Sequence, residues 1–265
     1  MEAKGKIVWI TGASSGIGRA LAAEFAGLGA NLVLSARNET ALQDFAREQR
    51  LPPERVLILP VDLQQYKKLP AAVNKVLKKF GSIDILVNNG GISQRSRAHE
   101  TDMAVYEQLM AVNYFGNIAL TLGVLPHMRA RRQGQIVTVS SVAGKFGTPL
   151  RSGYSASKFA LSGFYEALRA ENWRENIRVT VVLPGFIRTN VSANALTAGG
   201  KPQGKMDVGQ AAGMSAEECA RIMARGILKG KNEIYVGGIK ERFALHLSRH
   251  LPGVFARIIR KAKVT

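Results

Sequence analysis

Cysteine is nearly absent from this sequence, since Cys219 is the only one among 265 residues. A single cysteine excludes an intramolecular disulfide and a cysteine-rich metal site. It fits a reducing compartment. We therefore expect no metal centre and a fold held by apolar packing, because a chain of this length buries a sizeable core without cross-links.

Long apolar runs are missing as well. No stretch of about 18 or more uncharged apolar residues is present, the length that a membrane-spanning helix needs. The first residues, "MEAKGKIVWI", lack the basic start, the apolar run and the cleavage site of a signal peptide. We expect a cytoplasmic protein without a signal peptide or a spanning helix, with any membrane contact confined to its periphery.

Acidic residues are scarce. Aspartate and glutamate total 19 against 37 lysines and arginines, which gives a net charge of +18. Such a field favours anionic partners: phosphorylated cofactors, acidic lipid surfaces or nucleic acid. No segment interleaves basic and aromatic residues as nucleic-acid motifs do, so a nucleic-acid partner is not expected. Residues 221–265 hold eleven basic side chains against Glu233 and Glu241.

Apolar runs of strand length alternate with segments of helical spacing along the whole chain. The strands lack polar alternation, which is typical of strands buried on both faces of a parallel sheet. Regular alternation places helices on both sides of that sheet. The pattern predicts one α/β domain over 1–238, a Rossmann-like doubly wound fold with a seven-stranded parallel sheet. Ligands of such folds bind beyond the carboxyl ends of the strands. The seven expected strands lie in "KIVWI", "NLVLSAR", "RVLILPVD", "IDILVNNGG", "GQIVTVSS", "IRVTVVLPG" and "NEIYVGG".

A glycine-rich turn, "TGASSGIG", follows the first expected strand and precedes an amphipathic helix. Glycine lets the chain turn sharply and lets a diphosphate approach the backbone. The helix then points its unpaired N–H groups at the phosphates. A glycine triplet alone also suits a tight turn, but this position between strand and helix favours dinucleotide binding. The expected contacts are Gly12, Ser14, Ser15, Gly16, Ile17 and Gly18.

The second expected strand ends in "SARN". An NAD-binding fold carries an acid there for the ribose hydroxyl, whereas this chain has Ala36 followed by Arg37. A guanidinium suits a 2′-phosphate, so NADP(H) is favoured over NAD(H) and carbonyl reduction over alcohol oxidation. The alternative is a solvated surface arginine. After the third strand, Asp62 and Leu63 are expected to contact the cofactor. Asp62 either accepts a hydrogen bond from the adenine or caps a helix.

The stretch "SSVAGKFGTPLRSGYSASK" unites a hydroxyl, a phenol and an ammonium. Tyr154 and Lys158 are four residues apart and share a helix face. A free phenol keeps its proton up to a pH of about 10, and a nearby ammonium favours the ionised form. Tyr154 can therefore exchange a proton with a substrate oxygen near neutrality. Ser141, at the end of the fifth strand, can hydrogen-bond the same oxygen.

These motifs in this order resemble the short-chain dehydrogenases/reductases over nearly the whole chain. The resemblance implies that Ser141, Tyr154 and Lys158 act as described, and that Asn113 supports a water leading from the lysine to solvent. It implies that Asn88 stabilises the central strand. Where the family usually has alanine this chain has Gly90, and we expect the missing methyl to loosen the turn slightly. Further implied cofactor contacts are Asn89, Gly90, Tyr154, Lys158, Pro184, Gly185, Ile187 and Thr189.

Each of these residues also has a structural explanation that involves no catalysis. Tyr154 can be a packed residue, Lys158 a solvated charge and Asn113 a buried amide held by the backbone. Ser140 competes with Ser141 for the hydroxyl role, and the spacing to Tyr154 favours Ser141.

The resemblance implies a small hydrophobic carbonyl or alcohol substrate and a homodimer or homotetramer built on the helix that carries Tyr154. Residues 188–213 are rich in small and polar residues, which suggests a mobile lid over the substrate. A rival hypothesis is a catalytically silent dinucleotide-binding regulatory protein whose basic tail contacts a membrane or protein surface.

The tail, 239–265, is expected to form two amphipathic, basic helical pieces divided at "LPG". Its apolar side can pack against the domain or a second subunit, or it can lie on an anionic membrane.

Overall fold

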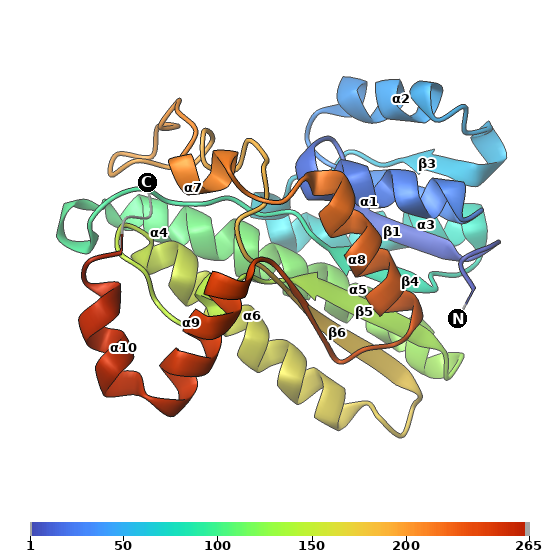
Figure 1. Cartoon of the computed structure of the whole chain (residues 1–265). Coiled ribbons are helices and arrows are strands. Elements are labelled where there is room, and N and C mark those ends of the chain that lie inside the picture. Colours follow the sequence, from blue (N-terminus) through green and yellow to red (C-terminus); the bar gives the residue numbers. More distant parts are fainter. Residues whose placement is uncertain (1, 263–265) are drawn as a thin grey trace.

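The computed structural model describes residues 2–262, and its strands form a single parallel sheet in the order β3-β2-β1-β4-β5-β6-β7 (Figure 1). Every strand pair is parallel, so the predicted Rossmann-like fold is confirmed. The order reverses between β1 and β4, the place where such sheets bind ligands. The strands are β1 Ile7–Thr11, β2 Asn31–Ser35, β3 Val56–Ile58, β4 Ile85–Asn88, β5 Gly134–Val139, β6 Ile177–Pro184 and β7 Glu233–Val236.

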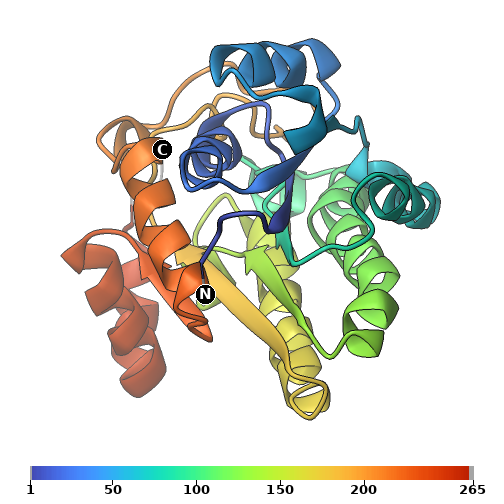
Figure 2. The same ribbon diagram turned by 90° about the vertical axis from the view of Figure 1, so that its right-hand side faces the viewer.

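Helices cover both faces of the sheet, with α8 on one side and α3 and α5 on the other (Figure 2). The α-helices are α1 Gly16–Gly27, α2 Glu39–Glu48, α3 Leu69–Phe80, α4 Met103–Met110, α5 Gly116–Ala130, α6 Ser152–Glu171, α7 Val208–Ala211, α8 Ala216–Leu228, α9 Ile239–His250 and α10 Pro252–Ile259. Shorter helical turns are η1 Pro53–Arg55, η2 Leu63–Lys68, η3 Ala98–Glu100, η4 Ala111–Phe115 and η5 Val142–Gly144.

Two apolar cores lie on opposite faces of the sheet because successive strand residues point to opposite sides. In β1, Val8 and Ile10 pack with α1, α2 and α8, whereas Trp9 packs with α3, α5 and α6. All five residues of β1 are buried, which explains the absence of polar alternation in the sequence.

A continuous helical segment runs from α4 through η4 into α5. This segment, Met103–Arg131, is long and apolar enough to cross a membrane by length and composition alone. Of its most apolar 18-residue stretch, 44% is buried inside the domain. One such helix is weak evidence for a membrane span, because a helix in the core of a globular domain passes the same test. The apolarity has a structural reason, since Leu120, Val124 and Met128 of α5 belong to the core.

The C-terminal tail forms the two expected helices, α9 and α10, which project from the domain as a hairpin (Figures 1 and 2). The end of the tail, Lys263 included, lies outside the described residues.

Candidate active site

The glycine turn joins β1 to α1 at the carboxyl edge of the sheet. Gly12 and Gly16 have positive φ values of 66° and 52°, which glycine adopts without strain. A Cβ on Gly18 would lie 2.2 Å from the Gly12 carbonyl oxygen. Ser15 occupies the N-cap of α1 without a side-chain capping bond. The turn thus offers open backbone and uncapped N–H groups, which fit a diphosphate.

The loop after β4 is bonded to the glycine turn. The Asn89 side chain donates to the carbonyl oxygen of Thr11 at 2.9 Å, and the Thr11 hydroxyl accepts from the N–H of Gly90 at 2.9 Å. A Cβ on Gly90 would lie 2.6 Å from Leu63 Cδ1. Leu63 therefore fills the space of the missing methyl, and the expected loosening of the turn at Gly90 stays a prediction.

Asn88, at the end of β4, has the stabilising position expected for it. Its amide donates to the hydroxyls of Thr121 and Tyr165, each at 2.9 Å. These bonds tie the central strand to α5 and α6.

Arg37 follows β2, the strand beside β1, and Asp62 follows β3, the next strand out. Arg37 is exposed, and the neighbouring position holds Ala36 rather than an acid. Asp62 caps η2, because its carboxylate accepts from the N–H of Gln64 at 3.0 Å. The capping alternative for Asp62 is observed.

Lys158 is the most unusual charge of the site. It is 4% exposed on α6, and its Nζ donates to the carbonyl oxygen of Val139, at the end of β5, at 2.8 Å. Burial lowers the pKa of Lys158 to about 8. Its Nζ lies 5.8 Å from the centroid of the Tyr154 ring. The solvated-charge reading of Lys158 is thereby excluded.

The two serines after β5 have different surroundings. Ser140 donates from Oγ to the carbonyl oxygen of Lys158 at 2.9 Å, a bond that holds α6 against β5. The Ser141 hydroxyl accepts from the N–H of Ala143 at 3.1 Å and donates to the Pro184 carbonyl oxygen at 3.4 Å. Since Ser140 is occupied by the helix backbone, Ser141 is the better candidate for contact with substrate.

Asn113 lies in η4, a π-helical turn, a deviation frequent at functional sites. Its side chain accepts from the N–H of Ile92 at 2.8 Å and donates to the Ile92 carbonyl oxygen at 2.9 Å. The expected reading as an amide held by backbone is observed. A Cβ on Gly91 would lie 3.0 Å from Asn113 Oδ1 and 3.4 Å from Lys158 Nζ, so the two groups meet at this glycine.

Tyr154 is half-buried in the first turn of α6, and Gln94 holds that turn. The Gln94 side-chain oxygen accepts from the N–H groups of Gly153 at 2.7 Å and of Tyr154 at 3.2 Å. Its amide nitrogen donates to Ser96 at 3.1 Å. Gln94 is fully buried. Sequence reasoning missed it, because nothing in "SQRS" indicates a partner about 60 residues away.

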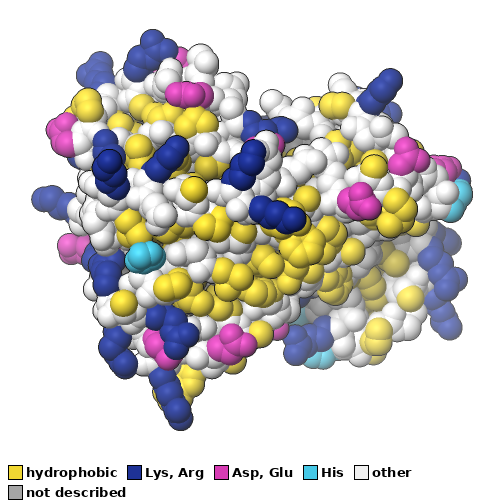
Figure 3. Space-filling view, turned by 180° about the vertical axis from the view of Figure 1, so that it is seen from behind, with side chains coloured by type: hydrophobic (Ala, Val, Ile, Leu, Met, Phe, Trp, Pro, Cys, Tyr) yellow, Lys and Arg dark blue, Asp and Glu magenta, His cyan; other side chains and the backbone are white. Residues whose placement is uncertain are grey.

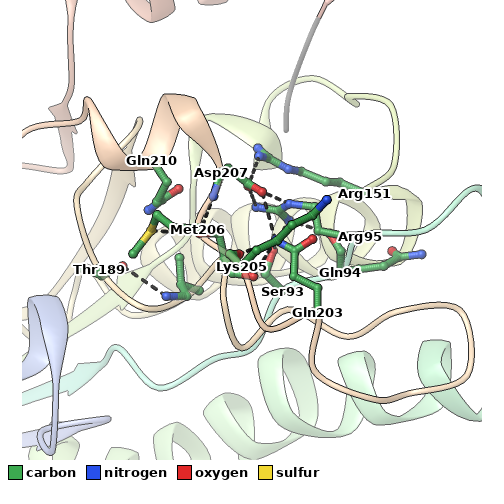
Figure 4. Close-up of polar contacts among 12 residues, drawn as sticks. Ser93, Gln94, Arg95, Arg151, Thr189, Gln203, Lys205, Met206, Asp207 and Gln210 are labelled. Carbon is green, nitrogen blue, oxygen red and sulfur yellow. Dashed lines mark hydrogen bonds and ion pairs between the residues drawn. The ribbon is translucent and has the colours of Figure 1, made fainter.

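A buried ion cluster joins the same loop to the expected lid (Figure 4). Arg95 donates from Nε to Asp207 Oδ2 at 2.8 Å, and Arg151 Nη2 lies 3.5 Å from the same oxygen. Burial disfavours the charge of Asp207, but the bonds from Arg95 and Gln203 prevail and lower its pKa. Segment 188–213 is therefore anchored at Asp207, which the sequence did not reveal because the partners are 112 residues apart.

The segment after β6 returns to the glycine turn. Gly185 follows Pro184 at the end of β6, and Ile187 is 1% exposed. A Cβ on Gly16 would lie 3.0 Å from the Thr189 methyl. The predicted cofactor contacts lie at or just after the carboxyl ends of β1, β2, β3, β4 and β6, except for Tyr154 and Lys158 on α6. They therefore gather at one edge of the sheet.

Within residues 2–262, no group of three or more His, Cys, Asp and Glu side chains is arranged to hold a metal. A cavity of about 830 Å³ lies between α8, β7 and α9. Its lining includes none of the four predicted catalytic residues, so it is separate from the site described above.

Comparison with known proteins gives one consistent family. Residues 6–198 match the family model for short chain dehydrogenases. A dehydrogenase/reductase SDR family protein 7-like from Anopheles gambiae is 44% identical over 97% of this chain and 83% of its own length.

Solved structures share the fold. A short chain dehydrogenase/reductase from Burkholderia phymatum in complex with NAD has a TM-score of 0.85 at 24% identity and covers 96% of both chains. A short chain dehydrogenase from Burkholderia cenocepacia in complex with NADP has a TM-score of 0.79 at 25% identity, over 98% of this chain and 99% of that one.

Proposed function

The chain belongs to the short-chain dehydrogenase/reductase family, and from this premise we propose that it is an NADP(H)-dependent reductase of a small hydrophobic carbonyl substrate. Membership makes it an oxidoreductase with a nicotinamide dinucleotide cofactor. The observation that carries the finer proposal is the buried ammonium of Lys158 beside the Tyr154 ring.

Tyr154 is the general acid of the proposed reaction. The cofactor, when bound, supplies a hydride to the carbonyl carbon. The phenol of Tyr154 gives its proton to the carbonyl oxygen, and the alcohol forms. The Lys158 ammonium stabilises the phenolate left behind. In the reverse direction the phenolate takes the proton back.

Two residues position the reacting groups. The Ser141 hydroxyl donates a hydrogen bond to the substrate carbonyl oxygen. To do so it gives up its 3.4 Å hydrogen bond to the Pro184 carbonyl oxygen. Asn113 fixes the backbone of Ile92 and lies beside Lys158 at Gly91. From that place it supports the water that returns a proton to the site.

The preference for NADP(H) rests on Arg37. Its exposed guanidinium follows β2, where an NAD-specific fold carries an acid. In titrations, we expect Arg37→Glu to weaken NADPH binding about tenfold or more and to change NADH binding much less. Arg50→Glu, at an exposed position just after α2, is the matched control. Equal losses for both cofactors in Arg37→Glu would contradict the preference.

We propose a homo-oligomer built on the helices beside the site. Apolar side chains gather across the middle of the face seen in Figure 3. Phe115, Leu122 and Phe159, on η4, α5 and α6, are 40%, 52% and 44% exposed, as expected for an interface. Leu122→Glu should lower the mass measured by light scattering to that of the monomer.

The activity test is cofactor consumption by the purified protein over a panel of hydrophobic ketones, aldehydes and diketones. We expect NADPH to be oxidised with some members of the panel. Tight NADPH binding without turnover on any member would favour the silent regulatory protein instead.

A further inference from the structure

We propose that the α9–α10 hairpin is a docking surface for an anionic lipid bilayer. The hairpin follows β7, and α9 has no buried residue. Phe255 is the only residue of α10 that is buried. Twenty residues of helix thus contribute little to the core and leave most of their side chains in solvent.

Apolar side chains on the hairpin are exposed in a pattern. Leu251, Val254 and Ile258 are spaced for one face of a helix, and Ile239 and Phe243 are four residues apart on α9. Single exposed apolar residues are normal, but a group of this size marks a contact surface. Their exposed fractions are Ile239 88%, Phe243 64%, Leu251 54%, Val254 46% and Ile258 54%.

The positive charge of the hairpin favours an anionic bilayer over a second copy of this chain as the partner. Residues 239–262 contain six basic side chains and one acid, Glu241. The basic residues are Lys240, Arg242, Arg249, Arg257, Arg260 and Lys261, all exposed. A second copy of this chain docked hairpin to hairpin would bring these charges together, which is unfavourable. A bilayer with acidic headgroups complements them, and each basic residue near its surface contributes about 1 kcal/mol.

A basic cavity extends this surface. The cavity of about 830 Å³ lies between α8, β7 and α9. Its lining carries one acid, Glu233, against five exposed basic residues: Arg225, Lys229, Lys231, Arg242 and Arg249. Because Arg242 and Arg249 belong to α9, the cavity is continuous with the hairpin. An acidic lipid headgroup is the ligand that this lining fits.

The hairpin is attached to the active-site rim at two points. The Glu241 carboxylate accepts from the N–H of Phe186, after β6, at 3.4 Å. The Phe255 ring packs edge-on against Phe146, 5.0 Å between centroids, in the loop between Ser141 and Tyr154. Docking would thus bring the rim to a bilayer, where hydrophobic carbonyl compounds concentrate.

The test is flotation of the full-length protein with vesicles of phosphatidylcholine alone or mixed with phosphatidylserine. We expect binding to the mixed vesicles, little binding to the neutral ones, and release at high salt. Phe243→Ser with Ile258→Ser, or Arg257→Glu with Arg260→Glu, should each weaken binding about tenfold. These positions are exposed, so circular dichroism and NADPH binding should stay unchanged.

Matched controls replace exposed residues elsewhere. Trp173→Ser is the apolar control, and Lys75→Glu with Lys78→Glu on α3 is the charge control. Both should bind vesicles as the wild type does. The proposal is overturned by failure to float with the mixed vesicles, by equal losses in the controls, or by hairpin variants that change oligomeric mass while vesicle binding persists.

Discussion

The side-chain oxygen of Gln94, in the loop after β4, accepts a hydrogen bond from the backbone N–H of Tyr154 at the start of α6, at 3.2 Å. A second bond from Gly153 measures 2.7 Å. These N–H groups belong to the first turn of α6. N–H groups of a first turn have no hydrogen-bond partner within their own helix. Gln94 therefore fixes the place from which the Tyr154 side chain extends.

Replacing Gln94 should impair turnover more than cofactor binding. Gln94→Leu removes both bonds and is expected to lower kcat about tenfold or more, because small misplacements of a proton donor are costly. NADPH affinity should stay within about twofold of wild type. Gln94→Glu keeps the acceptor but adds a negative charge near Tyr154, so the pH profile of kcat should move upward by roughly one unit.

A purely structural role for Gln94 would lower kcat and NADPH affinity together in Gln94→Leu. Gln43→Leu is the control, since among residues 2–262 the Gln43 side chain bonds only to Glu39, on the exposed surface of α2. An unchanged profile in Gln94→Glu, together with equal losses in kcat and NADPH affinity in Gln94→Leu, would contradict the positioning role.

The second prediction concerns the buried pair of Arg95 and Asp207. Asp207→Asn leaves Arg95 buried without a carboxylate, which should lower the free energy of unfolding by about 3 to 5 kcal/mol at neutral pH. The folded-state pKa of Asp207 is depressed. Its contribution is therefore complete above the unfolded value of about 3.9 and is lost as pH falls through the lower folded value.

Urea unfolding measures this effect across the pH range. The difference between Asp207→Asn and wild type should shrink below a pH of about 4. Asp44→Asn, in the exposed pair with Arg47, is the control and should cost less than about 1 kcal/mol. A difference that stays constant down to acid pH would exclude the ion pair as its cause.

Gly90 and Leu63 give a third prediction. A methyl on Gly90 would meet Leu63 Cδ1 at 2.6 Å. That atom ends a flexible side chain that can move aside, so Gly90→Ala should cost about 1 kcal/mol or less of unfolding free energy. Leu63→Ala alone should also destabilise, because it leaves a cavity. The double variant should cost clearly less than the sum of the two. Additive costs in a double-mutant cycle would show that the two residues are not in contact.

The fourth prediction follows from the burial of Lys158, which lowers its pKa to about 8. Between that value and the ordinary 10.4 the unfolded chain binds one more proton than the folded chain, so stability rises with pH across this window. Lys158 should raise the free energy of unfolding by roughly 3 kcal/mol across this pH window. Lys158→Met should lack this rise, and parallel stability curves for the two proteins would contradict the assignment.

The sequence identified the elements and the chemistry because both are encoded locally. The glycine turn, the spacing of Tyr154 and Lys158, and the Ser215 cap of α8, which accepts from the N–H of Glu218 at 3.1 Å, each lie within one short segment. The seven apolar strands could be predicted for the same reason.

What escaped the sequence depends on distant contacts. Gln94 bonds to Tyr154 across 60 residues and Arg95 bonds to Asp207 across 112. Neither pair leaves a periodic or spaced pattern in one sequence. The contact between Leu63 of η2 and the space beside Gly90 escaped for the same reason.

The most direct test of the central claim compares the wild type with Tyr154→Phe under single-turnover conditions, with NADPH and the best carbonyl compound of the panel. Phenylalanine keeps the ring beside Lys158 and removes only the hydroxyl. We predict hydride transfer slowed by about 10² to 10⁴-fold with NADPH affinity unchanged. A Tyr154→Phe variant that oxidises NADPH at the wild-type rate would contradict the role of Tyr154 as the proton donor.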